Sequence, residues 1–232
     1  MSDMGSDWSW SLALPGDGVT TVAIERVLTI AEAAGLSPKR PDGLINGFDN
    51  TPGHEGEHRA IDPDELVHGL ATGTWSTNLW NQSEVDIWLT TRSGTVTLSL
   101  DAVHCRRTPV AAAQPFRDLH HLLTELWVAI ADETGALFGR VEDEWSLEQI
   151  WSELTDPASG PTPPPVGALP EWLSWSTYFD APRYRRLPPL PGQGDATVRR
   201  TPGGAAVITL LTDPAAVDPV RFARLHHDYV AR

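Results

Sequence analysis

Residues 51–65 contain the string H-E-x-x-H, formed by His54, Glu55 and His58. In a zinc protease this string lies on a helix, where the histidines are one turn apart and bind zinc while the glutamate acts as general base. Here Gly56 lies inside the string, and a glycine costs about 1 kcal/mol in a helix interior. The flanking residues form no apolar stripe. We therefore predict a surface loop instead of a zinc protease, and a weak metal site on that loop is the alternative.

The remaining histidines and the cysteine form no recognisable catalytic set. His120-His121 and His226-His227 are adjacent pairs within predicted helices. Adjacent helical residues point about 100° apart, so neither pair can chelate one ion without distortion. Cys105 is the only cysteine, and no sequence motif places a base beside it. The sequence therefore predicts no catalytic residue, no metal site and no cofactor, which is typical of a protein that is not an enzyme.

The charge of the chain restricts its partners. Its 232 residues carry a formal net charge of -14, and Lys39 is the only lysine. Nucleic-acid binding needs a basic face, so we expect no nucleic-acid partner. An acidic protein attracts a basic protein over long range and thereby meets it faster. The alternative is that the charge only keeps the chain dissolved.

The sequence predicts no membrane-spanning segment and no signal peptide. It has no run of 18 apolar residues. The N-terminal residues MSDMGSDWSW are acidic and lack the basic and apolar regions of a signal peptide. We therefore expect a cytoplasmic protein with no membrane partner, and the sequence leaves its oligomeric state open.

A cluster of carboxylates and the ten tryptophans are the candidate binding features. Most tryptophans should lie in the core, although indole rings also favour interfaces. Carboxylates near a helix start stabilise the helix dipole, which is the local interpretation of the cluster. The functional interpretation is an acidic patch that binds a basic partner protein. The predicted patch residues are Glu142, Asp143, Glu144, Glu148 and Glu153.

Periodicity and turn residues indicate where the elements lie. Ser146 and Gln149 form a capping box that predicts a helix up to about residue 154, with Trp145 and Ile150 as its hydrophobic staple. Asp62 and Asp218 precede prolines and predict helix starts. Strands are expected at residues 8–14, 74–80 and 136–142, in a hairpin at 84–103, at 171–179, and in a hairpin that turns at Gly203-Gly204. The other helices are expected at residues 19–34, 63–70, 115–133 and 219–231.

These elements predict an α+β fold with a mixed, largely antiparallel sheet and helices packed on it, either as one unit or as two lobes. Residues 155–168 are rich in proline, which is typical of a stiff linker. The expected organisation is an N-terminal α+β part, residues 1–154, followed by the linker and a C-terminal part, residues 169–232. The linker is compatible with one sheet and with two lobes.

The C-terminal third resembles a known family. The run ALPEWLSWSTYFDAPRYRRLPPLPG, the later run ATVRRTPGGAAVITLLTD and a closing helix are similar to the immunity protein 52 family and related type VI immunity proteins. The resemblance implies a small cytoplasmic α+β protein that binds and neutralises a cognate toxin, often a nuclease, and carries no catalytic residues. It covers about 65 residues, and in the first 155 residues only the order of elements matches. The matching positions are Leu169, Pro170, Trp175, Thr177, Tyr178, Gly203 and Gly204.

Charge, tryptophan content and this resemblance together favour an immunity protein of a polymorphic toxin system. Its expected partner is a cognate basic toxin, for example a nuclease with a cleft lined by arginine and lysine. The first alternative is a general protein-interaction or scaffold protein, and the second is a metal-dependent hydrolase.

Overall fold

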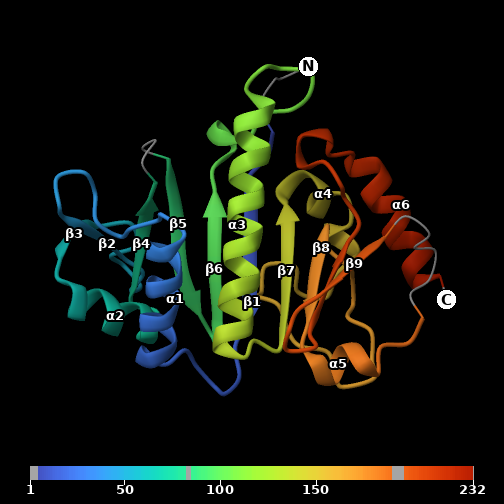
Figure 1. The fold of residues 1–232 in the computed structure, drawn as a ribbon, viewed down its shortest axis with the longest axis horizontal. Coiled ribbons are helices and arrows are strands. Elements are labelled where there is room, and N and C mark those ends of the chain that lie inside the picture. Colours follow the sequence, from blue (N-terminus) through green and yellow to red (C-terminus); the bar gives the residue numbers. More distant parts are fainter. Residues whose placement is uncertain (1–4, 82–84, 190–195, 232) are drawn as a thin grey trace.

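A computed structural model describes residues 5–81, 85–189 and 196–231. The described strands form a ten-stranded sheet in the order β3-β2-β4-β5-β6-β1-β7-β8-β10-β9, and helices pack against it (Figure 1). The pairings between neighbouring strands in this order are all antiparallel. The predicted α+β class is therefore confirmed.

The strands are β1 Trp8–Ala13, β2 Ile45–Asp49, β3 His58–Ile61, β4 Trp75–Trp80, β5 Asp86–Arg92, β6 Thr95–Leu100, β7 Phe138–Asp143, β8 Ser176–Phe179, β9 Thr197–Arg200 and β10 Ala206–Thr209. The α-helices are α1 Thr21–Ala33, α2 Pro63–Thr72, α3 Ala113–Thr134, α4 Glu144–Glu148, α5 Ala181–Arg185 and α6 Pro219–Val230. Short 3-10 helices cover Ala102–His104, Trp151–Glu153 and Pro214–Ala216. Among the described helices, none combines the length and the apolar character needed to cross a membrane.

Local sequence explains most of these boundaries. The Asp62 side chain accepts a hydrogen bond from the Glu65 backbone N–H at 2.8 Å and so caps α2, as predicted. The β5–β6 turn places Ser93 and Gly94 at positive φ, which suits a two-residue hairpin. The predicted hairpin at Gly203-Gly204 is also confirmed, because it joins β9 to β10.

The face of the sheet under α1 and α3 carries the main core. Trp10 and Leu12 on β1 alternate with serines and are buried on this side. The Trp10 Nε1–H donates to Thr124 Oγ1 on α3 at 3.0 Å, which satisfies the one polar group of the indole. Full burial of one such large apolar side chain contributes roughly 1.5–3 kcal/mol.

The opposite face of the sheet is polar and partly covered. Ser11 on β1 and Thr97 on β6 hydrogen-bond to each other there at 3.0 Å. Residues 155–168 form no helix or strand, and part of this segment lies against the polar face. Arg140 Nη2 donates to the Ser159 carbonyl at 3.3 Å. A Cβ on Gly160 would come within 2.6 Å of Thr95 Oγ1, so the backbone approaches the strand closely there.

The sheet is continuous across the proline-rich segment. Strand β7, which precedes the segment, pairs with β8, which follows it, from Phe138↔Phe179 to Val141↔Ser176. Residues on both sides of the segment therefore belong to one sheet, which answers the question that the sequence leaves open.

Several expected elements are wrong in detail. Helix α4 begins at Glu144, and its N-cap is Asp143, whose side chain accepts from the Ser146 N–H. The predicted Ser146 capping box and the Trp145 staple are therefore incorrect. The predicted strand 171–179 begins only at Ser176, and β2, β3 and α5 are not predicted at all. Of the C-terminal run quoted above, residues 190–192 lie outside the described residues.

Candidate functional site

The H-E-x-x-H string is not helical, and its first four residues lie in a loop, as predicted. His54 is in the β2–β3 connection, while His58 begins strand β3. The exposed His54 Nδ1 is 3.4 Å from Glu57 Oε1, and Glu55 Oε2 accepts from the Gly53 N–H at 2.8 Å. Within the described ranges, no group of three or more His, Cys, Asp or Glu side chains is placed to hold a metal ion. The string therefore lacks the helical geometry that zinc-protease chemistry needs.

Asp143 does not lie on the protein surface, and its expected place in an exposed patch is corrected. The residue is 1% exposed. Its Oδ1 accepts from Trp175 Nε1 at 2.5 Å, and its Oδ2 accepts from Ser6 Oγ at 3.1 Å and from the Ser146 N–H at 3.0 Å. Burial raises the pKa of Asp143, and these hydrogen bonds oppose that shift. The buried Asp143 side chain therefore links the end of β7 to the start of α4 and to the N-terminal segment.

Glu142 is also largely withdrawn from solvent. Its side chain is 13% exposed and is 3.8 Å from Arg140 Nε. Its Oε1 accepts from Trp172 Nε1 at 2.7 Å and from Ser174 Oγ at 2.8 Å. Glu142 therefore anchors the segment before β8 to the polar face of the sheet.

The other three predicted patch residues, Glu144, Glu148 and Glu153, are exposed, but their electrostatic surroundings differ. Burial, followed by repulsion from Asp7, Glu148 and Asp143, raises the pKa of Glu144. Glu153 Oε1 instead lies 2.9 Å from His227 Nε2 on α6, and this hydrogen bond is the main reason that the pKa of Glu153 is lowered. Glu144 and Glu148 thus remain in a negative field, whereas Glu153 is engaged within the chain.

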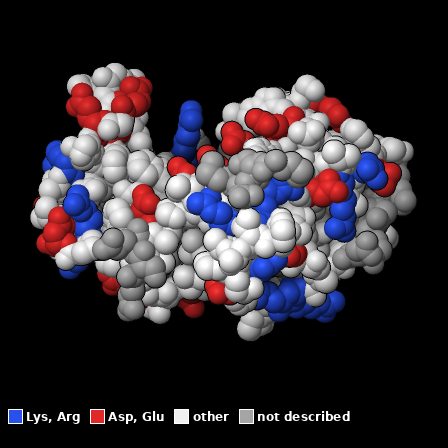
Figure 2. Space-filling model, turned by 90° about the horizontal axis from the view of Figure 1, so that it is seen from above, with Lys and Arg blue, Asp and Glu red and all other residues white. Residues whose placement is uncertain are grey.

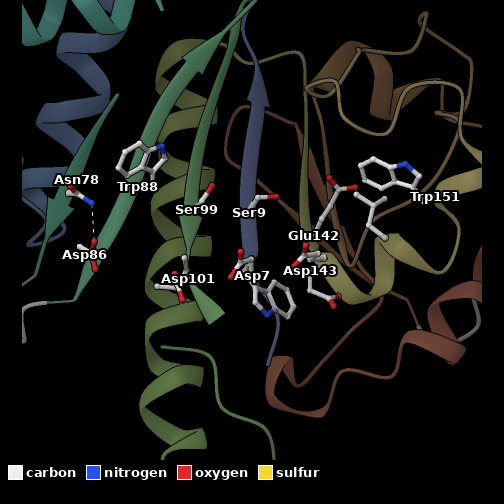
Figure 3. A pocket seen from close by; sticks show the side chains of 14 residues that line it. Asp7, Ser9, Asn78, Asp86, Trp88, Ser99, Asp101, Glu142, Asp143 and Trp151 are labelled. Carbon is white, nitrogen blue, oxygen red and sulfur yellow. Dashed lines mark hydrogen bonds between the residues drawn. The ribbon is translucent and has the colours of Figure 1, made fainter. Parts of the chain in front are cut away.

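The structure places a pocket of about 440 Å³ beside Glu144, on the sheet face opposite α3 (Figure 3). One cross-strand row, Trp88–Ser99–Ser9–Glu142, forms its floor, because these residues are paired in register across β5, β6, β1 and β7. Neighbouring strands are roughly 4.8 Å apart, so the row spans roughly 14 Å. Leu147 and Trp151, which follow β7, close the far side.

Carboxylates surround this floor. Asp86 begins β5, Asp7 precedes β1, Asp101 follows β6 and Glu144 begins α4. These positions converge because antiparallel neighbours bring strand starts and strand ends to the same edge. Seen from above, the molecule is hollowed between two raised parts, with acidic side chains on both sides of the hollow and a basic side chain standing between them (Figure 2). The residues that line the pocket include no lysine or arginine.

Local contacts hold several of these carboxylates in place. Asp86 Oδ2 accepts from Asn78 Nδ2 at 3.0 Å, and its Oδ1 is 3.5 Å from His104 Nε2. Asp7 Oδ1 accepts from the Ala102 N–H at 2.6 Å, and Asp101 caps the 3-10 helix at the end of β6. These contacts therefore hold the side chains of Asp7, Asp86 and Asp101 in defined positions at the pocket.

Two indoles lie on opposite sides of the pocket floor (Figure 3). Trp88 is half-buried and packs on Phe48 with ring centroids 4.6 Å apart. Trp151 is 47% exposed. Trp8, Trp10, Trp127, Trp172 and Trp175 are buried. These five tryptophans therefore belong to the core, whereas Trp88 and Trp151 lie on either side of the pocket.

The remaining titratable candidates are enclosed by apolar surroundings. His120 packs against Trp8 and Trp10 with centroid distances of 4.6 Å and 5.2 Å, and burial lowers its pKa to about 3. Cys105 is fully buried, and burial raises the pKa of its thiol to about 12. The thiolate is the nucleophilic and metal-binding form of cysteine, so this burial keeps Cys105 in its unreactive form. The His120 ring stays neutral among the aromatic rings that enclose it.

Sequence reasoning finds part of this site and misses the rest. Glu142, Asp143 and Glu144 line the pocket, whereas Glu148 and Glu153 do not. Asp7, Asp86 and Asp101 are missed because they are scattered along the chain. One clue exists in β5, where Asp86 and Trp88 alternate with buried Ile87 and therefore face the other side.

Comparison with known proteins does not assign the chain to a family. No family model and no curated protein matches the sequence. A solved structure titled "Pseudomonas aeruginosa T6SS protein PA0821" is similar at 11% identity with a TM-score of 0.44. The match covers 97% of this chain and 73% of that one. A likeness at this level transfers neither family nor function.

Proposed function

We propose that this chain is an immunity protein, which binds and neutralises a toxin and catalyses no reaction. The observation that carries the proposal is the acidic pocket with Trp88 and Trp151 on opposite sides. Charged surfaces of opposite sign speed encounter between proteins, and buried aromatic side chains slow dissociation. An inhibitor that must bind a toxin before the toxin acts needs both fast encounter and slow dissociation.

The partner that fits this surface is a basic protein, for example a nuclease. The formal net charge of -14 favours such a partner and disfavours nucleic acid. The C-terminal resemblance to immunity protein 52 and related type VI immunity proteins supports the same role. Its expected order of elements is present as strand β8, the β9–β10 hairpin and helix α6.

Co-expression tests this proposal. The product of the gene next to the one that encodes this chain is induced in a host cell, with and without the chain. We expect that product to stop growth alone and to be tolerated when the chain is present. Unchanged lethality in the presence of the folded chain would refute an immunity role, and a harmless neighbour would favour a scaffold protein.

A further inference from the structure

The pocket has a polar corner at which Asp86 meets no lysine or arginine of the pocket lining, while His104 Nε2 lies 3.5 Å from Asp86 Oδ1. We propose that this corner, formed by Asn78, Asp86 and Trp88, receives an arginine side chain of the partner protein. The inference deepens the proposed function, on which it rests, by naming the chemistry of the contact. Trp151 and Leu147 would then contact the apolar part of the same inserted segment.

Charge is the first argument. Asp7, Asp86, Asp101 and Glu144 line one pocket of about 440 Å³, and no lysine or arginine is among its lining residues. The raised pKa of Glu144 has repulsion from neighbouring carboxylates among its causes, after burial. A cationic guest relieves this repulsion, whereas a neutral guest such as a sugar leaves it in place.

The hydrogen-bond acceptors at this corner are the second argument. Asn78 is only 5% exposed, and its Nδ2 donates to Asp86 at 3.0 Å. None of the described residues donates a hydrogen bond to its Oδ1. Asn78 Oδ1 and the Asp86 carboxylate are both hydrogen-bond acceptors, so this corner favours a guest that brings N–H groups. A guanidinium offers five such donors in a planar fork.

The same chain already binds its own arginines in this manner. On the same face of the sheet, the Arg140 guanidinium lies 3.7 Å from the Trp172 ring centroid and is 3.8 Å from Glu142. Arg59 lies 4.8 Å from the Trp75 centroid and pairs with Glu65. Trp88 and Asp86 repeat this combination of an indole and a carboxylate, and none of the arginines that the structure describes lies over the Trp88 ring.

The planar shape favours arginine over lysine. A guanidinium can lie flat on an indole and hydrogen-bond to a carboxylate at its edge at the same time. Such cation–π contacts contribute roughly 0.5–1 kcal/mol when exposed and about 2 kcal/mol when desolvated. Phe48 holds the Trp88 ring in place, at a centroid distance of 4.6 Å, so little indole motion is lost on binding.

Titration of the whole chain with short peptides tests the inference. The probe is acetyl-Gly-Arg-Gly-amide, and its neutral isostere carries citrulline in place of arginine. The readout is the set of indole N–H resonances in a two-dimensional NMR spectrum, assigned with Trp88→Phe and Trp151→Phe. We expect saturable shifts of the Trp88 resonance with a dissociation constant on the order of 1 mM, and none with citrulline.

A matched pair of variants gives the control. Asp86→Asn with Glu144→Gln removes two charges from the pocket and should weaken arginine binding about tenfold. Glu25→Gln with Glu32→Gln removes two exposed charges from α1, on the other side of the sheet, and should leave binding unchanged. Equal weakening by both pairs would show general attraction only and would overturn the inference.

Two further outcomes separate the inference from the proposed function. Equal shifts with the citrulline peptide or with cellobiose, or no shift with arginine at tens of millimolar, would overturn the arginine site. If the co-expressed chain still protects cells in that case, the immunity role stands on another surface. Binding of arginine without protection would uphold the site and refute the immunity role.

Discussion

Replacement of Asp143 tests whether this carboxylate stabilises the fold or contacts a partner protein. Asp143 belongs to the acidic cluster in the sequence, yet it is 1% exposed and accepts hydrogen bonds from Ser6, Ser146 and Trp175. We therefore predict that Asp143→Ala lowers stability strongly. Glu144→Gln, one residue later on the exposed start of α4, is the matched control.

The magnitude follows from the bonds that are lost. Loss of the N-cap of α4 costs about 1 kcal/mol. A buried Ser6 hydroxyl without its acceptor costs about 1–3 kcal/mol. The Trp175 N–H keeps a second acceptor, Ser146 Oγ at 3.0 Å, and removal of a buried charge offsets part of the loss. We expect a net loss of about 2–3 kcal/mol for Asp143→Ala.

The pH dependence provides a second check on Asp143. Its pKa is raised in the folded state, so protonation is favoured by folding and this group adds stability as the pH falls through that raised value. Asp143→Asn lacks this gain. The deficit of the asparagine variant relative to the natural protein should therefore be smallest at neutral pH and should grow in acid.

Urea unfolding followed by circular dichroism measures these differences. We expect Glu144→Gln to remain within about 0.5 kcal/mol of the natural protein. If Asp143→Ala were as stable as that control but lost its partner, Asp143 would be a contact residue and the reasoning from burial would be wrong.

Three further predictions concern groups outside the pocket. Cys105 should resist a thiol reagent at pH 8 until the chain unfolds, because burial raises its pKa to about 12; rapid labelling of the native protein would contradict this. Gly69→Ala should cost about 1–3 kcal/mol in urea unfolding, because its Cβ would lie 1.8 Å from Trp75 Cδ1; unchanged stability would show that α2 shifts freely. Glu153→Gln should speed hydrogen exchange in α6, because it removes the contact with His227. The lowered pKa of Glu153 means that this contact stabilises the fold above pH 4.5 and is lost as the pH falls through the lower folded value; identical exchange in both proteins would contradict the role.

Local patterns predict most elements of this fold but not how they are assembled. The β5–β6 hairpin and the Asp62 cap follow from alternation and turn chemistry over a few residues. Strands β2 and β3 are short and polar, and they become strands because the sheet edge pairs with them. The α4 start is misplaced because Asp143 competes with Ser146 as N-cap, and only the buried partners of Asp143 decide between them.

The site is less predictable than the fold because it depends on register. Asp7, Asp86 and Asp101 come together only when β1 is inserted between β6 and β7, far from its sequence neighbours. The Glu142–Glu153 cluster is continuous in sequence, but α4 is short and turns its members to different surroundings. Carboxylates that are neighbours in the sequence therefore do not all belong to one surface patch. The carboxylates that line the pocket come from four separate segments.

Protection of cells by pocket variants tests the central claim most directly. The measurement is growth during induction of the neighbouring gene product, with Asp86→Asn/Glu144→Gln or Glu25→Gln/Glu32→Gln produced at equal levels. If the pocket binds the toxin, the first pair should lose protection and the second pair should protect like the natural protein. Full protection by the pocket variant, or equal loss with both pairs, would contradict the account.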